Sequence, residues 1–493
     1  MPGREGERIV SARRAIIYSS GSRYLVLLLQ IASTFVVAHQ VRPDQFGLTV
    51  IGGGVLMIAE ALRELGSAGY LVQQRELKLE QVRSGFTLAL GLTLLVGSAL
   101  YFGAPLVAAF YRESRLVAYL HVMVLGYLLG PFVAPIQALM SRDLGFHRIA
   151  AMDVTAGLVN AATAVTLARL GFGFMSVAWA SVAGGAAAML LGLLMQRDFR
   201  IYRPSLAHWR AVLTFGVHGS AAAMVFRLGE AMLYLALGRV IAPRSIALLQ
   251  RGVLITQLPE RVVLAGVTGV AMPAFAALVR QDRPLVPAYL HGIRLIAPVY
   301  LTAMLVLVPL APAIVHLVLG PQWAGAVPVV QIIAAGHLFG FVNVLSASAL
   351  IAAGGIRRVT PLALIQMGSL IAAALVAAPW GVTAIAWTAF VTSPVGALAS
   401  LLFARGRVPF PWRGLAAAVG PALPVTAAAL AGPALVALAT DWATIRPLLA
   451  LMVGATTCGL GWLGALAATN HPLLAELREA LPRSRRRPEP EFS

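Results

Sequence analysis

Long apolar segments, each about the length of a membrane-spanning helix, follow one another along almost the whole chain. A helix needs about 20 apolar residues to cross the hydrocarbon core of a bilayer, and reading the sequence in windows of about 19 residues predicts fourteen such segments. The first seven cover residues 15–38, 48–72, 84–109, 116–139, 150–168, 174–195 and 211–238, and the others cover 247–271, 290–317, 326–352, 360–378, 382–404, 414–438 and 447–468. The sequence therefore predicts a helical protein that crosses a membrane many times.

Polar side chains interrupt the first two segments at helical spacing. One face of the first segment carries Ser19, Arg23, Gln30 and Thr34, and one face of the second carries Glu60, Arg63, Glu64 and Ser67. A charge at the centre of a bilayer costs about 2.5–3.5 kcal/mol on insertion scales, so such groups persist only where they face a bundle interior, a wet cavity or each other. These two helices are therefore predicted to turn their polar faces toward a common interior.

Charged positions recur in the seventh and eighth segments. Arg227 and Glu230 lie one turn apart, and Gln257 and Arg261 share a face of the next segment beside Glu260. Pro259 would kink that helix and free a backbone carbonyl there.

The connection at residues 196–210 is among the longest and most polar, and it divides the chain into six-helix groups at 1–200 and 205–405, followed by a helix pair at 410–470 and a basic tail at 471–493. Transporters are often built from two related halves with the substrate site between them.

Composition and charge agree with a membrane protein. Hydrophobic residues make up 59% of the chain and charged residues 12%, whereas about a quarter of the residues of an ordinary soluble protein are charged. A formal net charge of +19 would suggest nucleic acid in a soluble chain. With the N-terminus placed in the cytoplasm, however, 25 of the 38 Lys and Arg residues fall in inside segments and 7 in outside loops. This bias follows the positive-inside rule, predicts cytoplasmic termini, and makes anionic lipid rather than nucleic acid the partner of the basic residues.

Both ends of the chain leave a structural alternative open. The apolar segment at 15–38 contains Arg23 and exceeds the core of a signal peptide, which favours an uncleaved first transmembrane helix. The tail is predicted as a disordered basic end that only fixes topology. The alternative is an interfacial helix with Leu473, Leu474, Leu477 and Leu481 on one face. Most tryptophans, including Trp323 and Trp380, lie near segment ends, as in an interfacial aromatic belt.

Motifs of enzymes are missing from the sequence. It contains no HExxH, GxSxG or P-loop lysine motif, and its one cysteine, Cys458, has no metal-site spacing. Most predicted loops are under about 15 residues, too short for a catalytic domain. We therefore expect no cofactor, no metal and no enzymatic activity, and we expect transport without ATP hydrolysis by this chain.

Five local patterns resemble the bacterial flippases of polysaccharide or oligosaccharide repeat units, within the multidrug/oligosaccharidyl-lipid/polysaccharide exporter superfamily. In chain order they are LGSAGYLVQQRELKLEQVRSGFTL at 65–88, PIQALMSRDLGFHR at 135–148, MPAFAALVRQD at 272–282, LGPQWAGAVPVVQII at 319–333 and ALIAAGGIRR at 349–358. The resemblance implies two six-helix bundles in a V around a central cationic cavity, working by alternating access. It also implies a polyprenyl-pyrophosphate-linked oligosaccharide as substrate, the inner membrane as location, and a glycan polymerase and export machinery as candidate partners.

Arginine suits a pyrophosphate because it offers paired donors and stays charged. The predicted substrate contacts are Arg23, Arg63, Arg227 and Arg261, and the predicted gating or cavity residues are Glu60, Glu64, Glu230, Gln257 and Glu260. The structural alternatives are a self-neutralising cluster of Arg63 with Glu60 and Glu64, and a one-turn pair of Arg227 with Glu230.

Two other functions compete with the flippase. A cation-coupled multidrug exporter of the same superfamily is disfavoured because an excess of arginine would repel cationic drugs. A membrane glycan polymerase or ligase is disfavoured because such enzymes carry a large extracytoplasmic loop, and the longest outside loop here is about ten residues.

Overall fold

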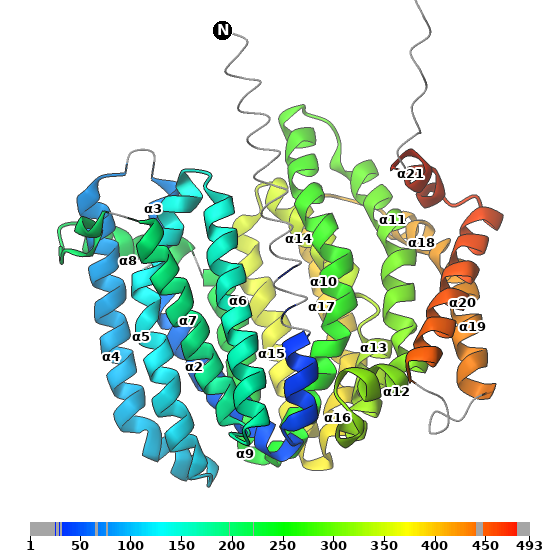
Figure 1. Ribbon diagram of the computed structural model, residues 1–493. Helices are drawn as coiled ribbons and strands as arrows, with labels where there is room; N and C mark the ends of the chain where they lie inside the picture. The colour runs from blue at the N-terminus through cyan, green and yellow to red at the C-terminus, as the bar shows by residue number, and fades with distance from the viewer. Residues whose placement is uncertain are drawn as a thin grey trace, which may run out of the picture. The chain divides into compact units, whose positions relative to one another are not determined.

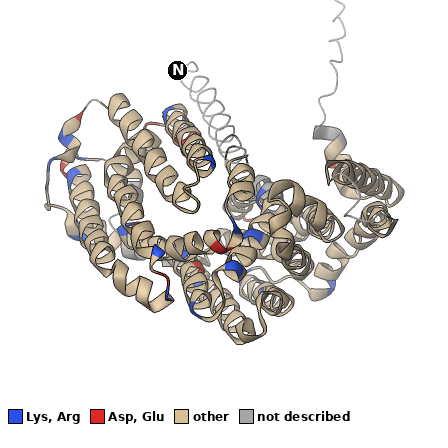
Figure 2. Cartoon of the chain, turned by 60° about the horizontal axis from the view of Figure 1, so that its bottom comes forward, with Lys and Arg blue, Asp and Glu red and all other residues tan. Residues whose placement is uncertain are grey.

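The computed structural model describes residues 25, 29, 32–64, 68–74, 77–196, 198–219, 221–439 and 447–480. Every regular element that these residues form is a helix (Figure 1). Helices are expected in lipid because each satisfies its backbone N–H and C=O groups within one segment. Figure 2 shows long helical stretches without any charged residue, as the apolar segments of the sequence require. The predicted all-α, multi-pass membrane class is confirmed.

Ten described helices are long and apolar enough to span a membrane. They become eleven if the pair Pro321–Gly336 and Gly340–Ala352, bent by 48°, is one span. Each of the eleven corresponds to a predicted segment. Of the remaining three, residues 15–38 fall largely outside the described residues, 211–238 correspond to the helices Trp209–Gly219 and Ala221–Val240 on either side of residue 220, which is not described, and 247–271 lie within a charged helix. The count of fourteen spans and the V arrangement stay predictions.

The described chain forms two compact units by its internal contacts. The first contains the described parts of residues 1–250 together with 318–323 and 367–385. Its main helices are α2 (Pro43–Glu64), α3 (Ala68–Gln73), α4 (Leu79–Tyr111), α5 (Arg115–Arg142), α6 (Phe146–Arg169), α7 (Met175–Met195), η1 (Phe199–Tyr202), α8 (Trp209–Gly219), α9 (Ala221–Val240) and η4 (Ala378–Trp380). Figure 1 shows α4, α5, α6 and α7 as long helices that run side by side. Tyr70, Ile136, Met140 and Met152 form a buried cluster at one end of this unit.

The second unit contains residues 251–317, 324–366 and the described part of 386–493. Its helices are α11 (Leu285–Leu305), α12 (Leu307–Val318), α13 (Val327–Gly336), α14 (Gly340–Ala352), η3 (Ile356–Arg358), α17 (Ala389–Arg405), α18 (Trp412–Val419), α19 (Ala422–Ala439), α20 (Pro447–Ala468) and α21 (Pro472–Ala480). α10 (Pro243–Arg280), η2 (Pro321–Ala326), α15 (Val359–Ala377) and α16 (Val382–Trp387) each contain residues of both units, and the last residue of α12, Val318, belongs to the first unit. The predicted division into six-helix groups with a separate helix pair stays a prediction.

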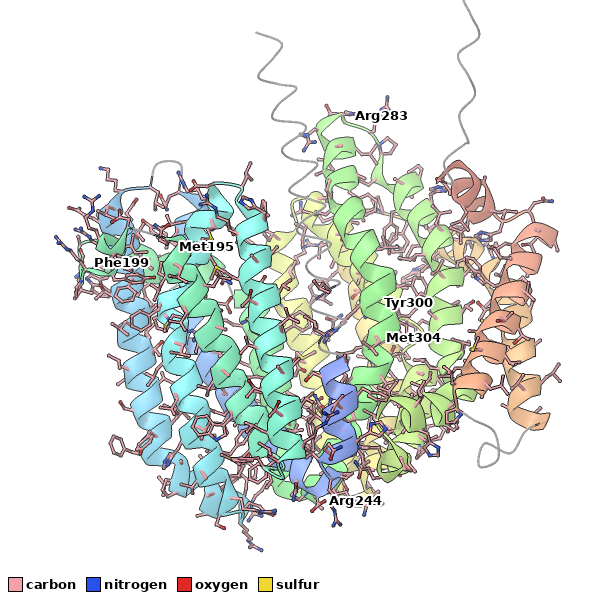
Figure 3. All side chains as sticks on the ribbon, viewed as in Figure 1. Met195, Phe199, Arg244, Arg283, Tyr300 and Met304 are labelled. Carbon is pink, nitrogen blue, oxygen red and sulfur yellow. The ribbon has the colours of Figure 1, made fainter. Side chains whose placement is uncertain are left out.

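Among the described residues, helix α11 contributes seven of the nineteen buried residues in the core cluster of the second unit. Tyr289, Tyr300 and Met304 are buried along it, and Figure 3 labels the last two. The buried hydroxyls are satisfied, because Tyr289 Oη lies 2.8 Å from Ser346 Oγ and Tyr300 Oη donates to the His337 carbonyl at 3.2 Å. This pairing is what the dry interior of a membrane protein requires.

Proline residues interrupt the hydrogen bonds of several helices, and side chains replace the missing donors. Pro105 in α4 has no N–H for the Tyr101 carbonyl, and His121 Nε2 donates to that oxygen at 3.0 Å. In α12, Pro312 likewise leaves the Val308 carbonyl open, and Gln331 Nε2 donates to it at 2.9 Å. Each kink is therefore tolerated in lipid because a neighbouring helix completes it.

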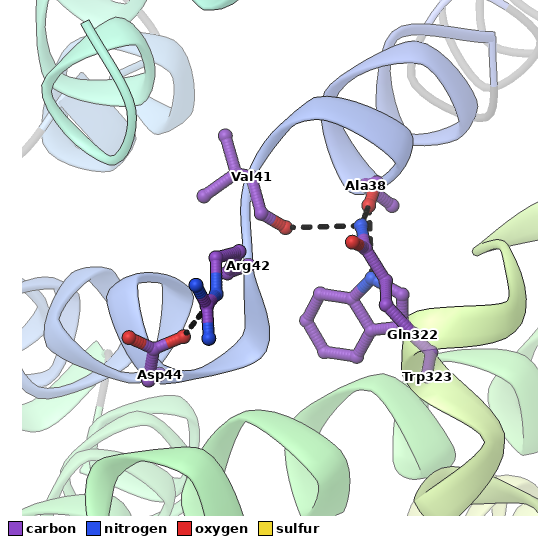
Figure 4. Close-up of polar contacts among 6 residues, drawn as sticks. All are labelled: Ala38, Val41, Arg42, Asp44, Gln322 and Trp323. Atoms are coloured by element: carbon purple, nitrogen blue, oxygen red, sulfur yellow. Dashed lines mark hydrogen bonds and ion pairs between the residues drawn. The ribbon is translucent and has the colours of Figure 1, made fainter. Parts of the chain in front are cut away.

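The LGPQW pattern forms a clasp inside the first unit (Figure 4). The carbonyl of Ala38 lies near the end of a helical stretch at 32–40, where helix carbonyls lose their own partners. Trp323 Nε1 donates to this carbonyl at 2.9 Å, and Gln322 Nε2 donates to the same oxygen. Gly320 has φ +96° beside the His39 ring, a backbone conformation that favours glycine.

Trp323 corrects the prediction of an aromatic belt at this position. Its side chain is fully buried, with its ring edge-on to Phe46 at 5.8 Å between centroids, while Trp380 is 72% exposed. The sequence position of Trp323 and Trp380 near segment ends does not distinguish them. Trp323 is buried because its indole N–H donates to the carbonyl of Ala38, which lies 285 positions earlier in the chain.

Candidate functional site

Arg63, near the end of α2, is held by a proline kink in α5. Pro131 has no N–H for the carbonyl of Tyr127, four residues earlier, and Arg63 Nη1 donates to that oxygen at 3.2 Å. The guanidinium also lies over the Tyr127 ring, 5.0 Å from its centroid. A guanidinium has five N–H donors, so this arginine is fixed in place while most of its donors stay available.

Gly130 leaves the space on α5 that the Arg63 guanidinium occupies. A Cβ built on Gly130 would lie 1.8 Å from Arg63 Nη1. Tyr127 is fixed in turn, because its hydroxyl donates to the Ala59 carbonyl in α2 at 2.9 Å. The Arg63 guanidinium therefore lies directly on the α5 backbone.

Glu64 and Arg227 form an ion pair between α2 and α9. Glu64 Oε2 lies 2.7 Å from Arg227 Nη1, and the two side chains are 39% and 51% exposed. The alternative in which Arg227 pairs with Glu230 on its own helix does not occur, and Glu230 has no ion pair with any residue that the structure describes. The partner comes from another helix because α2 and α9 pack side by side in this unit.

One cavity of about 220 Å³ collects four of the predicted site residues. Its charged lining consists of Glu60, Arg63, Glu64 and Arg227, and its apolar lining consists of Leu71, Gly85, Ala89, Pro131, Ala134 and Pro135. The two arginines are balanced by two glutamates, so the formal charge of this lining is zero. The central cationic cavity stays a prediction, and the cavity described here has a lining of mixed charge.

A second cavity of about 310 Å³ lies between α2, α5 and α7. Glu60 and Arg63 line it as well, so these two side chains separate the cavities. Its remaining lining is neutral and includes Gln137 and Ser181.

The other predicted site residues lie elsewhere. Arg261 is exposed on α10, and its Nη2 donates to Gln257 Oε1 one turn earlier at 2.9 Å. Arg23 and the side chain of Glu260 lie outside the described part of the chain. Among the described residues, no group of three or more His, Cys, Asp or Glu could hold a metal ion.

Residues 36–328 match a protein family described as "Polysaccharide biosynthesis protein". The chain belongs to this family. Among curated proteins it is 22% identical over 330 residues to the teichuronic acid biosynthesis protein TuaB of Bacillus subtilis strain 168, covering 64% of this chain and 66% of TuaB. It is 23% identical over 322 residues to the lipopolysaccharide biosynthesis protein WzxC of Escherichia coli K12, covering 64% and 65%. The chain thus spans about two thirds of the length of these relatives.

Two solved structures have a fold similar to that of this chain. The lipid II flippase MurJ, in an inward closed conformation, matches with a TM-score of 0.72 at 12% identity, covering 92% of this chain and 99% of MurJ. An inward-facing multidrug resistance transporter of the MATE family matches with a TM-score of 0.66 at 16% identity, covering 80% and 98%. This chain therefore shares the fold of MurJ and of the MATE transporter.

Sequence reasoning missed the residues that position Arg63 in this family member. Tyr127, Gly130 and Pro131 are neutral and lie in an apolar segment, so neither charge nor helical spacing singled them out. The available signal was the pair Gly130–Pro131 inside a spanning helix, because a proline there leaves a carbonyl that another segment must satisfy.

The Glu64–Arg227 pair is expected to contribute little to folding. Both side chains are roughly half exposed, and exposed ion pairs contribute about 0.2–1 kcal/mol. A double-mutant cycle of Glu64→Gln and Arg227→Gln on the free energy of unfolding should therefore give a coupling below about 1 kcal/mol. A coupling of about 3 kcal/mol or more, as for a buried pair, would make Arg227 a structural residue instead of a candidate anion contact.

Proposed function

We propose that this protein is a secondary transporter that flips a polyprenyl-pyrophosphate-linked oligosaccharide from the cytoplasmic to the outer leaflet. It would work by alternating access in the inner membrane, for cell-surface polysaccharide biosynthesis. The observation that carries the proposal is the cavity in which Arg63 and Arg227 meet within a helical membrane unit of this family. Arginine matches the paired oxygens of a diphosphate and remains charged at any working pH.

The names of similar proteins support the same substrate class. The curated relatives are named for biosynthesis of teichuronic acid, of lipopolysaccharide and of succinoglycan, the last as a transport protein. MurJ is named as a lipid II flippase. These names favour a lipid-linked glycan over a cationic drug as the cargo.

The proposed roles follow the chemistry of the side chains. Arginines bind the diphosphate, and carboxylates and amides serve as partners that release them during the transport cycle. The proposed substrate contacts are Arg23, Arg63, Arg227 and Arg261, and the proposed gating or cavity residues are Glu60, Glu64, Glu230, Gln257 and Glu260. Of these, Arg63 has the most fixed geometry and Arg227 the partner that is easiest to exchange, because its pair with Glu64 is half exposed.

The proposal also covers the topology of the protein in the membrane and its partners. Both termini face the cytoplasm, as the positive-inside bias of the loops favours. The chain acts as a transporter and not as an enzyme, and needs no cofactor. Membrane lipid surrounds it, and a glycan polymerase with export machinery acts on the cargo after it has been flipped.

A lipid extract from a strain without this gene tests the proposed function. Mass spectrometry should show accumulation of a complete oligosaccharide unit on its polyprenyl-diphosphate carrier, and the surface polymer should be lost. Complementation with the intact chain should reverse both changes. If the lipid-linked glycans and the surface polymer are unchanged in a strain without a redundant flippase, the glycan proposal is wrong. Increased drug susceptibility of the same strain would then favour the multidrug exporter.

A further inference from the structure

Two cavities in the first unit share a wall. The cavity of about 220 Å³ and the cavity of about 310 Å³ are both lined by Glu60, Arg63 and Ala134. Arg63 cannot swing freely between them, because the Tyr127 carbonyl and the Gly130 backbone hold it. A ligand group in one cavity and a second group in the other would therefore both reach the same guanidinium.

The cavities differ in the chemistry of their linings. The smaller one adds the ion pair of Glu64 and Arg227, whereas the larger one adds the neutral polar groups of Gln137 and Ser181. Ser181 Oγ donates to the Val177 carbonyl at 3.0 Å, so its oxygen is left to accept a hydrogen bond. The carboxylate of Glu60 has no hydrogen bond or ion pair with any described residue, and a carboxylate is a strong acceptor for hydroxyl groups.

Small residues make room in the larger cavity. Gly126, Gly130, Gly185 and Ala188 line it on α5 and α7. A volume of about 310 Å³ is at the lower end of the range for small-ligand sites, about 300–1,000 Å³, and suits a ligand group of about one sugar ring. A lipid chain fits this lining poorly, because it would leave the Glu60 carboxylate without a hydrogen-bond partner among the described residues.

We propose that the two cavities form one bipartite site, in which the smaller cavity, lined by both Arg63 and Arg227, binds the diphosphate and the larger cavity binds the sugar bonded to it. This inference rests on the proposed function. In a glycosyl diphosphate the first sugar is attached directly to a phosphate oxygen, so the two groups must occupy neighbouring compartments. Arg63 lies at the junction and donates to the oxygens between sugar and phosphate. Glu60 and Gln137 bind the sugar hydroxyls.

Binding of two matched probes to the purified full chain in lipid nanodiscs tests the proposal. The probes are a short polyprenyl diphosphate and the same lipid carrying a single hexose. The intact chain should bind the glycosylated probe about tenfold more tightly, as one or two additional hydrogen bonds would give. Ala188→Phe should fill the sugar compartment and abolish this preference while leaving the affinity for the bare diphosphate unchanged.

A second variant and a control show whether a change in probe affinity comes from the sugar compartment or from a general effect on folding. Gln137→Leu removes a polar group at nearly constant volume and should reduce the preference several-fold without changing the bare-lipid affinity. Ala99→Phe adds the same ring to an exposed position on α4 that lines neither cavity and should change nothing.

The outcomes separate this inference from the function on which it rests. Equal affinity of the intact chain for both probes would overturn the sugar compartment while leaving the flippase proposal in place. An equal loss of both affinities in Ala188→Phe would also overturn it. No binding of either probe by the intact chain would count against the proposed function itself.

Discussion

Replacing Trp323 by alanine is expected to lower the free energy of unfolding by about 3–5 kcal/mol, the cost typical of removing a fully buried aromatic side chain. The indole is fully buried, and its Nε1 donates to the Ala38 carbonyl at 2.9 Å. The substitution would leave a cavity beside Phe46 and remove one of the two side-chain donors to the Ala38 carbonyl at a helix end. The loss should appear in the thermal or chemical unfolding of the purified chain.

Two further variants separate packing from hydrogen bonding at this position. Trp323→Phe keeps most of the buried volume and should cost about 1–2 kcal/mol, mainly for the lost hydrogen bond. Trp380→Ala removes a side chain that is 72% exposed and should change stability by less than about 0.5 kcal/mol. Equal losses in Trp323→Ala and Trp380→Ala would contradict the clasp.

Replacing Arg63 by alanine is expected to reduce transport of the lipid-linked glycan by about 10- to 100-fold. Hydrogen bonds to charged groups contribute about 1.5–3 kcal/mol, and each 1.4 kcal/mol is a factor of ten. The measurement is the rate of flipping in reconstituted vesicles, with protein amount and unfolding temperature monitored beside it.

Two variants show whether the position of the Arg63 guanidinium matters as well as its charge. Gly130→Ala keeps the arginine but places a methyl group where Nη1 now lies, so transport should fall although the charge is retained. Arg169→Ala removes an exposed arginine at the end of α6 that lines neither cavity and should leave the rate unchanged. Full activity of both Arg63→Ala and Gly130→Ala would remove Arg63 from the substrate site.

The helices of this protein could be predicted from the sequence because each reflects a local property. An apolar run of membrane-spanning length forms a helix whatever its neighbours are, so eleven predicted segments have counterparts among the described helices. The polar face of α2 was predicted in the same way, since Glu60, Arg63 and Glu64 follow helical spacing and line one cavity.

The partners of these side chains could not be predicted, because they are set by packing between distant segments. Arg227 lies one turn from Glu230 in the sequence, yet its carboxylate partner is Glu64 on α2. Arg63 has two glutamates beside it, yet it donates to a backbone carbonyl of α5. Local spacing limits which residues share a face, whereas the arrangement of helices decides which faces meet.

Three side chains donate hydrogen bonds to carbonyls that prolines leave open, and this pairing limits how the sequence can change in evolution. Arg63 serves the carbonyl opened by Pro131, His121 the one opened by Pro105, and Gln331 the one opened by Pro312. Losing the donor alone leaves the carbonyl without a hydrogen-bond partner, and losing the proline alone leaves the donor without its carbonyl, because the backbone N–H then takes it. In related sequences, the proline and the donor of each pair should therefore be kept or replaced together. Covariation at these three pairs would then identify helices that are in contact.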